Sequence, residues 1–330
     1  MAYENLTDEQ REVRELIRTI ARERIAPRAA EIDHSSEFPW DVVELFREHE
    51  LFGLAHEEQY GGSGIGMLMM LVAIEEVSRV CATSGLILAV QELGSIPLRL
   101  AGSEEQKQRW IPKLVSGEWL GAYALTEPGS GSDSAAMLTT ARREGDEYVI
   151  NGAKRFITNA GVADVYTVFA KTDPTAGHKG ISAFVVEKDA VPGHSFALEQ
   201  PGGGKVEGRA IDTLGYRGMH SYEVSFSDWF VPAENLVGGA EGLGKGFYLQ
   251  MEGFENGRLQ TAARAVGLMQ AAYEAAVAYA GNRVVFGRTV GDYQLTKAKL
   301  ARMAVVIQAS RQFSYQVARL MAKGEGIVEA

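Results

Sequence analysis

Apolar residues in the first third of the chain recur with the period of an α-helix. Thr7 and Gln10 match a helix-capping box, and apolar positions then follow every three or four residues until Pro27 interrupts the pattern. The same spacing returns in three further segments, at residues 39–46, 67–80 and 83–100. The sequence therefore predicts an all-helical N-terminal domain over residues 1–120.

The pattern changes after Trp119 to the two-residue alternation of β-strands. Residues 148–150 and 154–158 alternate on either side of Asn151 and Gly152, a dipeptide typical of hairpin turns. Further runs of β-branched and aromatic residues lie at 165–170, 181–186 and 223–226. We expect a middle, antiparallel β domain over residues 121–235.

Helical spacing returns after Gly246, with one long helix to about residue 279 and another at 294–321. Two such helices form a hairpin whose apolar face needs a partner: the first domain, another subunit, or helices outside this chain. The sequence therefore predicts an incomplete C-terminal helical bundle domain over residues 236–330. The expected fold class is α+β and multidomain.

Composition narrows the function classes. The net charge is -10, from 33 basic and 43 acidic residues, which disfavours binding to a polyanionic nucleic acid. The single cysteine, Cys81, cannot form an internal disulfide and lies in an apolar helical segment, so we expect a buried thiol. The first residues lack a secretory signal and no apolar run is long enough for a membrane span. A cytoplasmic protein is expected.

The sequence does not match the common motifs for nucleotide binding, metal binding or serine hydrolase activity. The glycines at 61–66 follow a helix and do not fit G-x-G-x-x-G, and those at 202–204 lack the Ser or Thr of a P-loop. Six histidines are scattered without metal-ligand spacing, and no G-x-S-x-G occurs around Ser130. We expect no metal site and no serine hydrolase chemistry.

The informative segment is residues 123–133, with the sequence Y-A-L-T-E-P-G-S-G-S-D, at the join between the helical and β domains. It offers hydroxyls and backbone N–H groups with few bulky side chains, which suits close approach to a polar ring system or a pyrophosphate. Taken alone, the segment is equally compatible with an exposed turn.

This segment and N-G-A-K-R-F-I-T-N at 151–159 resemble the signatures of the acyl-CoA dehydrogenase family. Further matches follow in the family's order at 214–218, 231–235, Arg258, Gly267 and 283–287, so the resemblance covers essentially the whole chain. The segment 201–209, ahead of 214–220, is similar to the methylsuccinyl-CoA dehydrogenase-like subgroup.

The resemblance implies FAD-dependent α,β-desaturation of a short or branched acyl-CoA thioester in a homodimer or homotetramer. Electrons would then pass to an electron-transferring flavoprotein. Two alternatives stay open: an acyl-CoA oxidase-like or nitroalkane oxidase-like flavoprotein that is reoxidised by oxygen, and a non-catalytic FAD or acyl-CoA binding protein.

The resemblance also implies site residues. Arg283, Phe286 and Gln294 match positions that reach the FAD of a neighbouring subunit, and Ser132, Glu255 and Arg258 match substrate-binding positions. The full set of implied cofactor positions is Tyr123, Leu125, Thr126, Gly131, Ser132, Phe156, Ile157, Thr158, Arg283, Phe286 and Gln294.

The catalytic base is not found in the sequence. Most family members place a glutamate in a Y-E-G-T-like stretch far along the C-terminal region, and nothing resembling it occurs before Ala330. A minority use a glutamate just before the arginine equivalent to Arg258, and here that position is Gly257. We therefore expect that the family's C-terminal part is absent, that the base lies beyond Ala330, and that the 330-residue chain is inactive.

Overall fold

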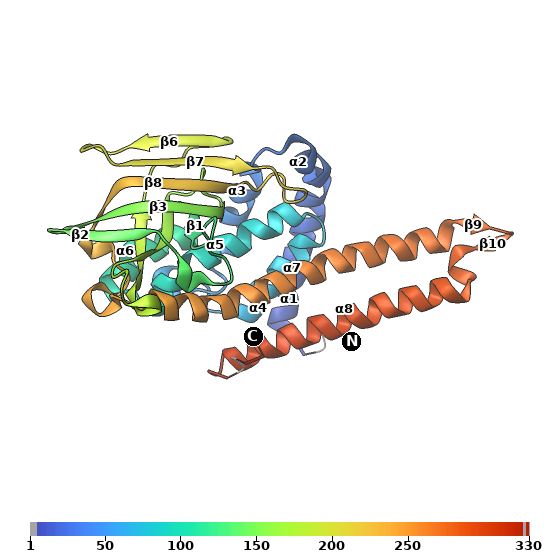
Figure 1. Ribbon diagram of the computed structural model, residues 1–330. Coiled ribbons are helices and arrows are strands. Elements are labelled where there is room, and N and C mark those ends of the chain that lie inside the picture. The colour runs from blue at the N-terminus through green and yellow to red at the C-terminus, as the bar shows by residue number, and fades with distance from the viewer. Residues whose placement is uncertain (1–4, 326–327, 330) are drawn as a thin grey trace.

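The computed structural model describes residues 5–325 and 328–329, which form a helical N-terminal part, a β domain beside it and a long helical hairpin (Figure 1). The predicted capping box at Thr7 and Gln10 is confirmed, and a second one forms at Ser103 and Gln106. The N-terminal helices are α1 (Asp8–Ile20), α2 (Ala29–Ser35), α3 (Trp40–Glu48), α4 (Met67–Ser78), α5 (Ala82–Ala101) and α6 (Glu104–Ser116). Cys81 is buried between α4 and α5, as expected.

The β domain is one sheet with the order β1-β4-β2-β3-β8-β7-β6, and β5 pairs with β4. Most pairs are antiparallel as predicted, but β1 and β2 each pair with β4 in parallel. The strands are β1 (Gly121–Ala124), β2 (Thr140–Glu144), β3 (Glu147–Thr158), β4 (Val165–Lys171), β5 (Ile181–Glu187), β6 (Ser195–Glu199), β7 (Lys205–Ile211) and β8 (Ser221–Pro232).

The predicted turn at Asn151 and Gly152 is wrong. β3 runs straight through these residues, and the hairpin turn lies earlier, between Glu144 and Glu147, where Gly145 has a φ of 61°. Asn151 instead exchanges hydrogen bonds with Asp228 of β8, beside a register shift between Ile150 and Gly152. Long-range pairing with β8 therefore overrides the local turn preference of the dipeptide.

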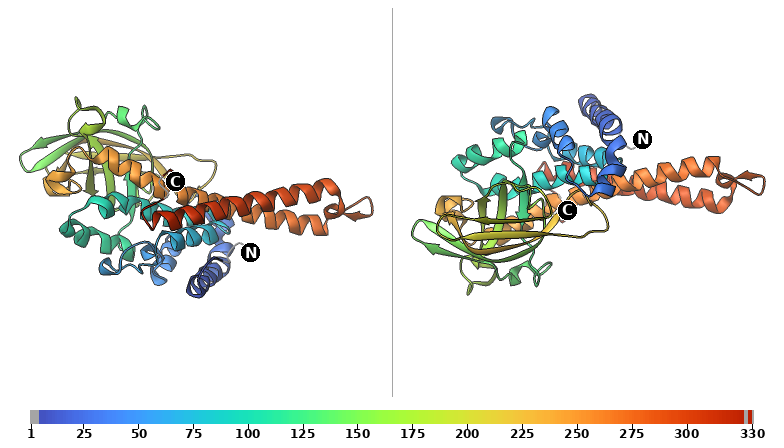
Figure 2. Two further views of the ribbon diagram at one scale, coloured as in Figure 1. Left: turned by 90° about the horizontal axis from the view of Figure 1, so that it is seen from below. Right: turned by 90° about the horizontal axis from the view of Figure 1, so that it is seen from above.

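The C-terminal part is a hairpin of α7 (Gly246–Asn282) and α8 (Gln294–Met321), joined at its tip by β9 (Val284–Val285) and β10 (Arg288–Thr289). Its outer part projects away from the rest of the molecule as an arm in all three views (Figures 1 and 2). The inner part of α7 crosses α4 closely: a Cβ on Gly267 would lie 2.4 Å from the carbonyl oxygen of Glu75. Glycine at this position is required for that contact.

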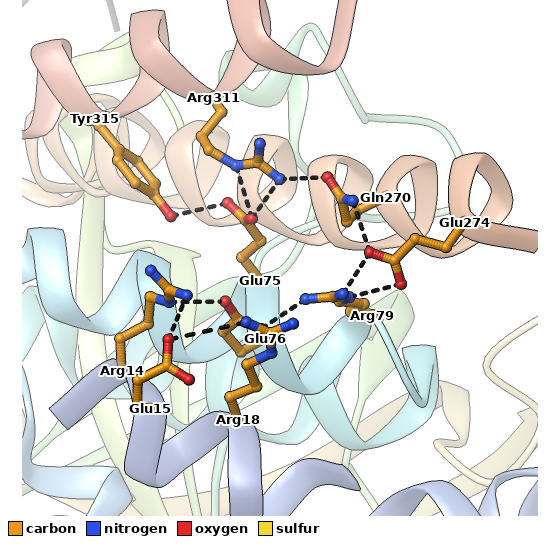
Figure 3. Close-up of polar contacts among 10 residues, drawn as sticks. All are labelled: Arg14, Glu15, Arg18, Glu75, Glu76, Arg79, Gln270, Glu274, Arg311 and Tyr315. Carbon is orange, nitrogen blue, oxygen red and sulfur yellow. Dashed lines mark hydrogen bonds and ion pairs between the residues drawn. The ribbon is translucent and has the colours of Figure 1, made fainter. Parts of the chain in front are cut away.

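A buried polar network joins four helices (Figure 3). Glu75 and Glu76 are adjacent on α4, and each is 2% exposed. Glu75 accepts hydrogen bonds from Arg311 Nε and from the Tyr315 hydroxyl of α8, both at 2.8 Å. Glu76 faces the other way and pairs with Arg14 of α1 at 3.2 Å. Burial and the neighbouring Glu75 raise the pKa of Glu76, while the surrounding arginines oppose this shift.

Replacing Arg311 with leucine should strongly destabilise the protein, because it leaves the Glu75 carboxylate buried without its ion-pair partner. We expect the free energy of unfolding to fall by about 3 to 5 kcal/mol, measured by chemical denaturation. Arg319→Leu, which removes a surface arginine bonded to Asn5, should cost less than about 1 kcal/mol. Equal losses of unfolding free energy in the two variants would show that the buried ion pair contributes no more to stability than the surface hydrogen bond.

Candidate functional site

A cavity of about 200 Å³ opens where α5, β1, β3 and α7 meet. Helix α5 contributes two apolar side chains, and α7 contributes an aromatic one. Five of the lining residues are cofactor positions implied by the sequence, and they come from two segments about thirty residues apart. The lining residues are Val90, Leu93, Tyr123, Leu125, Thr126, Phe156, Thr158 and Phe254.

A bulge in β3 turns Phe156 toward the cavity. From the pair Lys154–Val224 to the pair Ile157–Tyr222, β3 advances three residues while β8 advances two, so β3 holds one extra residue. Phe156 has a φ of 59°, which is unusual for a bulky residue, and its side chain is 56% exposed. Ile157 is 1% exposed and belongs to the core of the sheet, so its side chain does not line the cavity.

Tyr123, one of the lining residues, has an unsatisfied polar group. Its hydroxyl oxygen is buried and has no hydrogen-bond partner within the described part of the chain. Burial raises the pKa of this phenol, which therefore stays protonated at neutral pH. A buried hydroxyl without a partner costs free energy unless a bound molecule satisfies it.

The loop after β1 holds the remaining signature residues at different depths. Thr126 is half-buried and its carbonyl accepts a hydrogen bond from the backbone N–H of Arg155 at 2.7 Å. Gly131 and Ser132 are exposed further along the loop and are not among the cavity-lining residues. Thr158 is also half-buried, and its hydroxyl lies 2.8 Å from that of Ser221.

Two of the implied substrate residues, Glu255 and Arg258, lie on α7 beside Phe254. Arg258 is exposed, with its guanidinium 5.7 Å from the Phe254 ring centre, and Glu255 is half-buried. Partial burial and the nearby Glu252 raise the pKa of Glu255, and Arg258 opposes them. A Cβ on Gly257 would lie 3.5 Å from Leu93, a lining residue. No carboxylate is among the lining side chains that the structure describes.

The structure does not bring Arg283, Phe286 and Gln294 to this cavity. They lie around the tip of the helical arm, far from the β domain in Figure 1, and Phe286 is 93% exposed. Three lining residues that the sequence did not single out are Val90, Leu93 and Phe254. Apolar residues at helical spacing are indistinguishable in sequence from ordinary core positions, so no signal marked them.

Two further properties concern the described residues as a whole. Within residues 5–325 and 328–329, no group of three or more His, Cys, Asp or Glu side chains could hold a metal ion. In the same ranges no helix is both long and apolar enough to cross a membrane.

The cavity fits the edge of a flat, partly polar ring system such as a flavin. Its walls are apolar or aromatic, while Tyr123, Thr126 and Thr158 add hydroxyls. The lining residue Tyr123 also carries one of the buried polar atoms that lack a partner in the described part of the chain.

Comparison with known proteins decides the family. Family models match three consecutive parts of the chain: the acyl-CoA dehydrogenase N-terminal domain over residues 7–118, the middle domain over 122–229 and the C-terminal domain over 244–330. The chain belongs to the acyl-CoA dehydrogenase family. It is an oxidoreductase, and the predicted helical, β and helical order of an acyl-CoA dehydrogenase is confirmed.

Relatives of this acyl-CoA dehydrogenase differ in the acyl groups they are named for. It is 42% identical to the short-chain-specific acyl-CoA dehydrogenase of Clostridium acetobutylicum, over 97% of this chain and 81% of that protein. It is 40% identical to the (2S)-methylsuccinyl-CoA dehydrogenase of Cereibacter sphaeroides, over 95% of this chain and 56% of that protein. A chain of the structure described as the electron transferring flavoprotein of Acidaminococcus fermentans superposes with a TM-score of 0.89 at 35% identity, over 98% and 81%.

Proposed function

We propose that this dehydrogenase binds FAD and desaturates a short or branched acyl-CoA thioester whose acyl group is uncharged. The observation that carries the proposal is the cavity between α5, β1, β3 and α7. There the implied cofactor positions Tyr123, Thr126, Phe156 and Thr158 converge with apolar residues that suit an aliphatic chain.

The residues that line the cavity would have different roles around the flavin. The bound flavin supplies the acceptor for the hydride that leaves the β-carbon. Thr126 and Thr158 would donate or accept hydrogen bonds at the polar edge of the ring, and Phe156 would cover it. Val90, Leu93 and Phe254 would exclude water from the reacting carbons, which strengthens every polar interaction there.

An uncharged acyl group is favoured by the lining of the cavity. None of the described side chains that line the cavity is charged. A free carboxylate on the acyl group would therefore lose its hydration there without gaining a counter-ion. The segment that resembles methylsuccinyl-CoA dehydrogenases does not supply such a counter-ion. Lys205, at the start of β7, instead pairs with Glu199 of β6 at 2.6 Å. Neither Lys205 nor the exposed Arg209 lines the cavity.

We also propose an electron-transferring flavoprotein as the electron acceptor. The likeness to a chain of the structure described as the electron transferring flavoprotein of Acidaminococcus fermentans supports this choice. Reoxidation tests it: the reduced protein with product bound should react slowly with air and rapidly with an electron-transferring flavoprotein. Rapid reoxidation by oxygen would instead favour the oxidase alternative.

Removing the hydroxyl of Thr126 should weaken FAD binding. We expect Thr126→Ala to raise the Kd for FAD roughly 3- to 10-fold, since one hydrogen bond contributes about 1 kcal/mol. Titration of the apoprotein by flavin fluorescence measures this. Thr19→Ala, an exposed threonine on α1, is the control and should leave the Kd unchanged. Equal Kd values for both variants would remove Thr126 from the site.

A carboxylate at position 257 should create a catalytic base. We expect residues 1–330 to bleach bound FAD slowly with short acyl-CoA thioesters under anaerobic conditions, and Gly257→Glu to accelerate bleaching by about 10²-fold. Position 257 has room, since its nearest neighbour is Leu93 at 3.5 Å. Gly257→Gln is the matched control without a basic group and should stay slow.

Rapid bleaching by the unmodified chain would contradict the expectation of a missing base. Glu255→Gln would then show whether the half-buried Glu255 serves as the base. The Gly257→Glu variant can also be tested with a thioester of a dicarboxylic acid, such as methylsuccinyl-CoA. Faster bleaching by this thioester than by butyryl-CoA would overturn the proposal that the acyl group of the substrate is uncharged.

We propose that the protein is a homo-oligomer in which the tip of the arm completes a neighbour's cofactor site. The tip is exposed and carries Arg283, whose guanidinium can pair with a pyrophosphate. Arg283→Ala should lower both the flavin-to-protein ratio and the mass seen by light scattering, whereas Arg24→Ala, an exposed residue elsewhere, should change neither. A stable, FAD-loaded monomer would refute the proposal.

A further inference from the structure

A lysine and a glutamate are paired in the interior of the β domain. Lys154 of β3 is 0% exposed and Glu127 of the loop after β1 is 6% exposed, and their Nζ and Oε1 atoms lie 2.8 Å apart. Burying two charges is costly, and an apolar pair of similar size often stabilises a fold as well or better. The pair therefore calls for a role other than stability.

Each partner also binds the backbone of the signature loop. Lys154 Nζ donates to the carbonyl oxygen of Leu125 at 3.1 Å. The Glu127 carboxylate accepts hydrogen bonds from the backbone N–H groups of Leu138 at 2.6 Å and Thr139 at 3.0 Å. One ion pair thus holds both ends of the loop from residue 125 to residue 139.

Thr126 lies between the two residues that this pair fixes. Its own carbonyl is held by the N–H of Arg155, the residue after Lys154. The residues on both sides of Thr126 and its own backbone are therefore tied to one short stretch of β3. Because Thr126 has few free backbone motions left, the direction of its side chain into the cavity is set by these contacts.

Lys154 also precedes the bulge that exposes Phe156. It is the last residue of β3 in register with β8 before the shift that ends at Ile157. The same side chain thus anchors two cavity residues, Thr126 through the loop and Phe156 through the strand.

Electrostatics are compatible with a charged pair at neutral pH. Burial by itself raises the pKa of Glu127, but Lys154 and the donors from Thr139 and Leu138 lower it more, so its net pKa is lowered. Burial lowers the pKa of Lys154 to about 8, with Glu127 opposing the shift.

We propose that Lys154 and Glu127 are positioning residues that align Thr126 and Phe156 with each other for the flavin. They do not line the 200 Å³ cavity themselves and act through the two residues that do. The inference rests on the proposed binding of FAD. If the pair is a positioning element, its removal should affect the bound flavin far more than the stability of the apoprotein.

The test replaces both charges at once, because a single change would leave one charge buried alone. Glu127→Gln combined with Lys154→Met keeps similar side-chain volumes. Glu199→Gln combined with Lys205→Met is the matched control, since this pair lies in the same sheet and is exposed. Measured quantities are the Kd for FAD, the absorbance maximum and reduction potential of the bound flavin, and the melting temperature of the apoprotein.

We expect the buried double variant to raise the Kd for FAD about tenfold or more and to shift the absorbance maximum and the potential. Its apoprotein should melt within a few degrees of the unmodified one, and the control should match the unmodified protein in every respect. An unchanged Kd, spectrum and potential would overturn the positioning role. Failure of the unmodified protein to bind FAD would instead overturn the proposed function.

A second measurement needs no variant and covers the case in which the double variant does not fold. Hydrogen exchange at the Leu138 and Thr139 amides, which bind Glu127, should slow by about tenfold or more when FAD is added, because the flavin stabilises the loop conformation in which these bonds form. The Gly208 amide, in the sheet between β6 and β8, is the reference and should change little. Equal changes at all three amides would contradict the proposal.

Discussion

The adjacent glutamates Glu75 and Glu76 on α4 are the constraint on which the arrangement of the helical parts depends. They point to opposite sides of a helix buried on almost every face, one toward α8 and the other toward α1 (Figure 3). Because a buried carboxylate must keep its ion-pair partners, the two ends of the chain are tied to the same helix. Gly267 lets α7 cross at the same place.

This anchoring has a direct consequence for the site. Helix α7 runs from the crossing with α4 back to the cavity, where it presents Phe254. Helix α5, packed on α4 and on β1, supplies Val90 and Leu93. The cavity is therefore built by elements that the glutamate pair and its neighbours hold together, although none of these polar residues touches it. Stability and site geometry depend on the same helix packing.

One of the residues with a strained backbone lies at the candidate site. Phe156 adopts a left-handed backbone conformation at a bulge, which costs on the order of 1 kcal/mol or more. Lys154 and Ile157, on either side of the bulge, are both buried, so packing of the strand on both sides holds the bulge in place. The exposed aromatic ring beside two buried residues is what a surface prepared for a planar ligand requires.

The sequence by itself determined the order of the three parts, most helix limits, the capping box at Thr7 and the signature segments, because periodicity and short motifs are local properties. The helix predicted at residues 294–321 is α8 as observed. Tertiary structure alone decided that Asn151 and Gly152 lie inside β3, and that Phe156 rather than Ile157 faces the cavity. It also selected Val90, Leu93 and Phe254 from many similar apolar positions. Pairing with β8 and packing between distant segments set these features, and neither leaves a mark on neighbouring residues in the sequence.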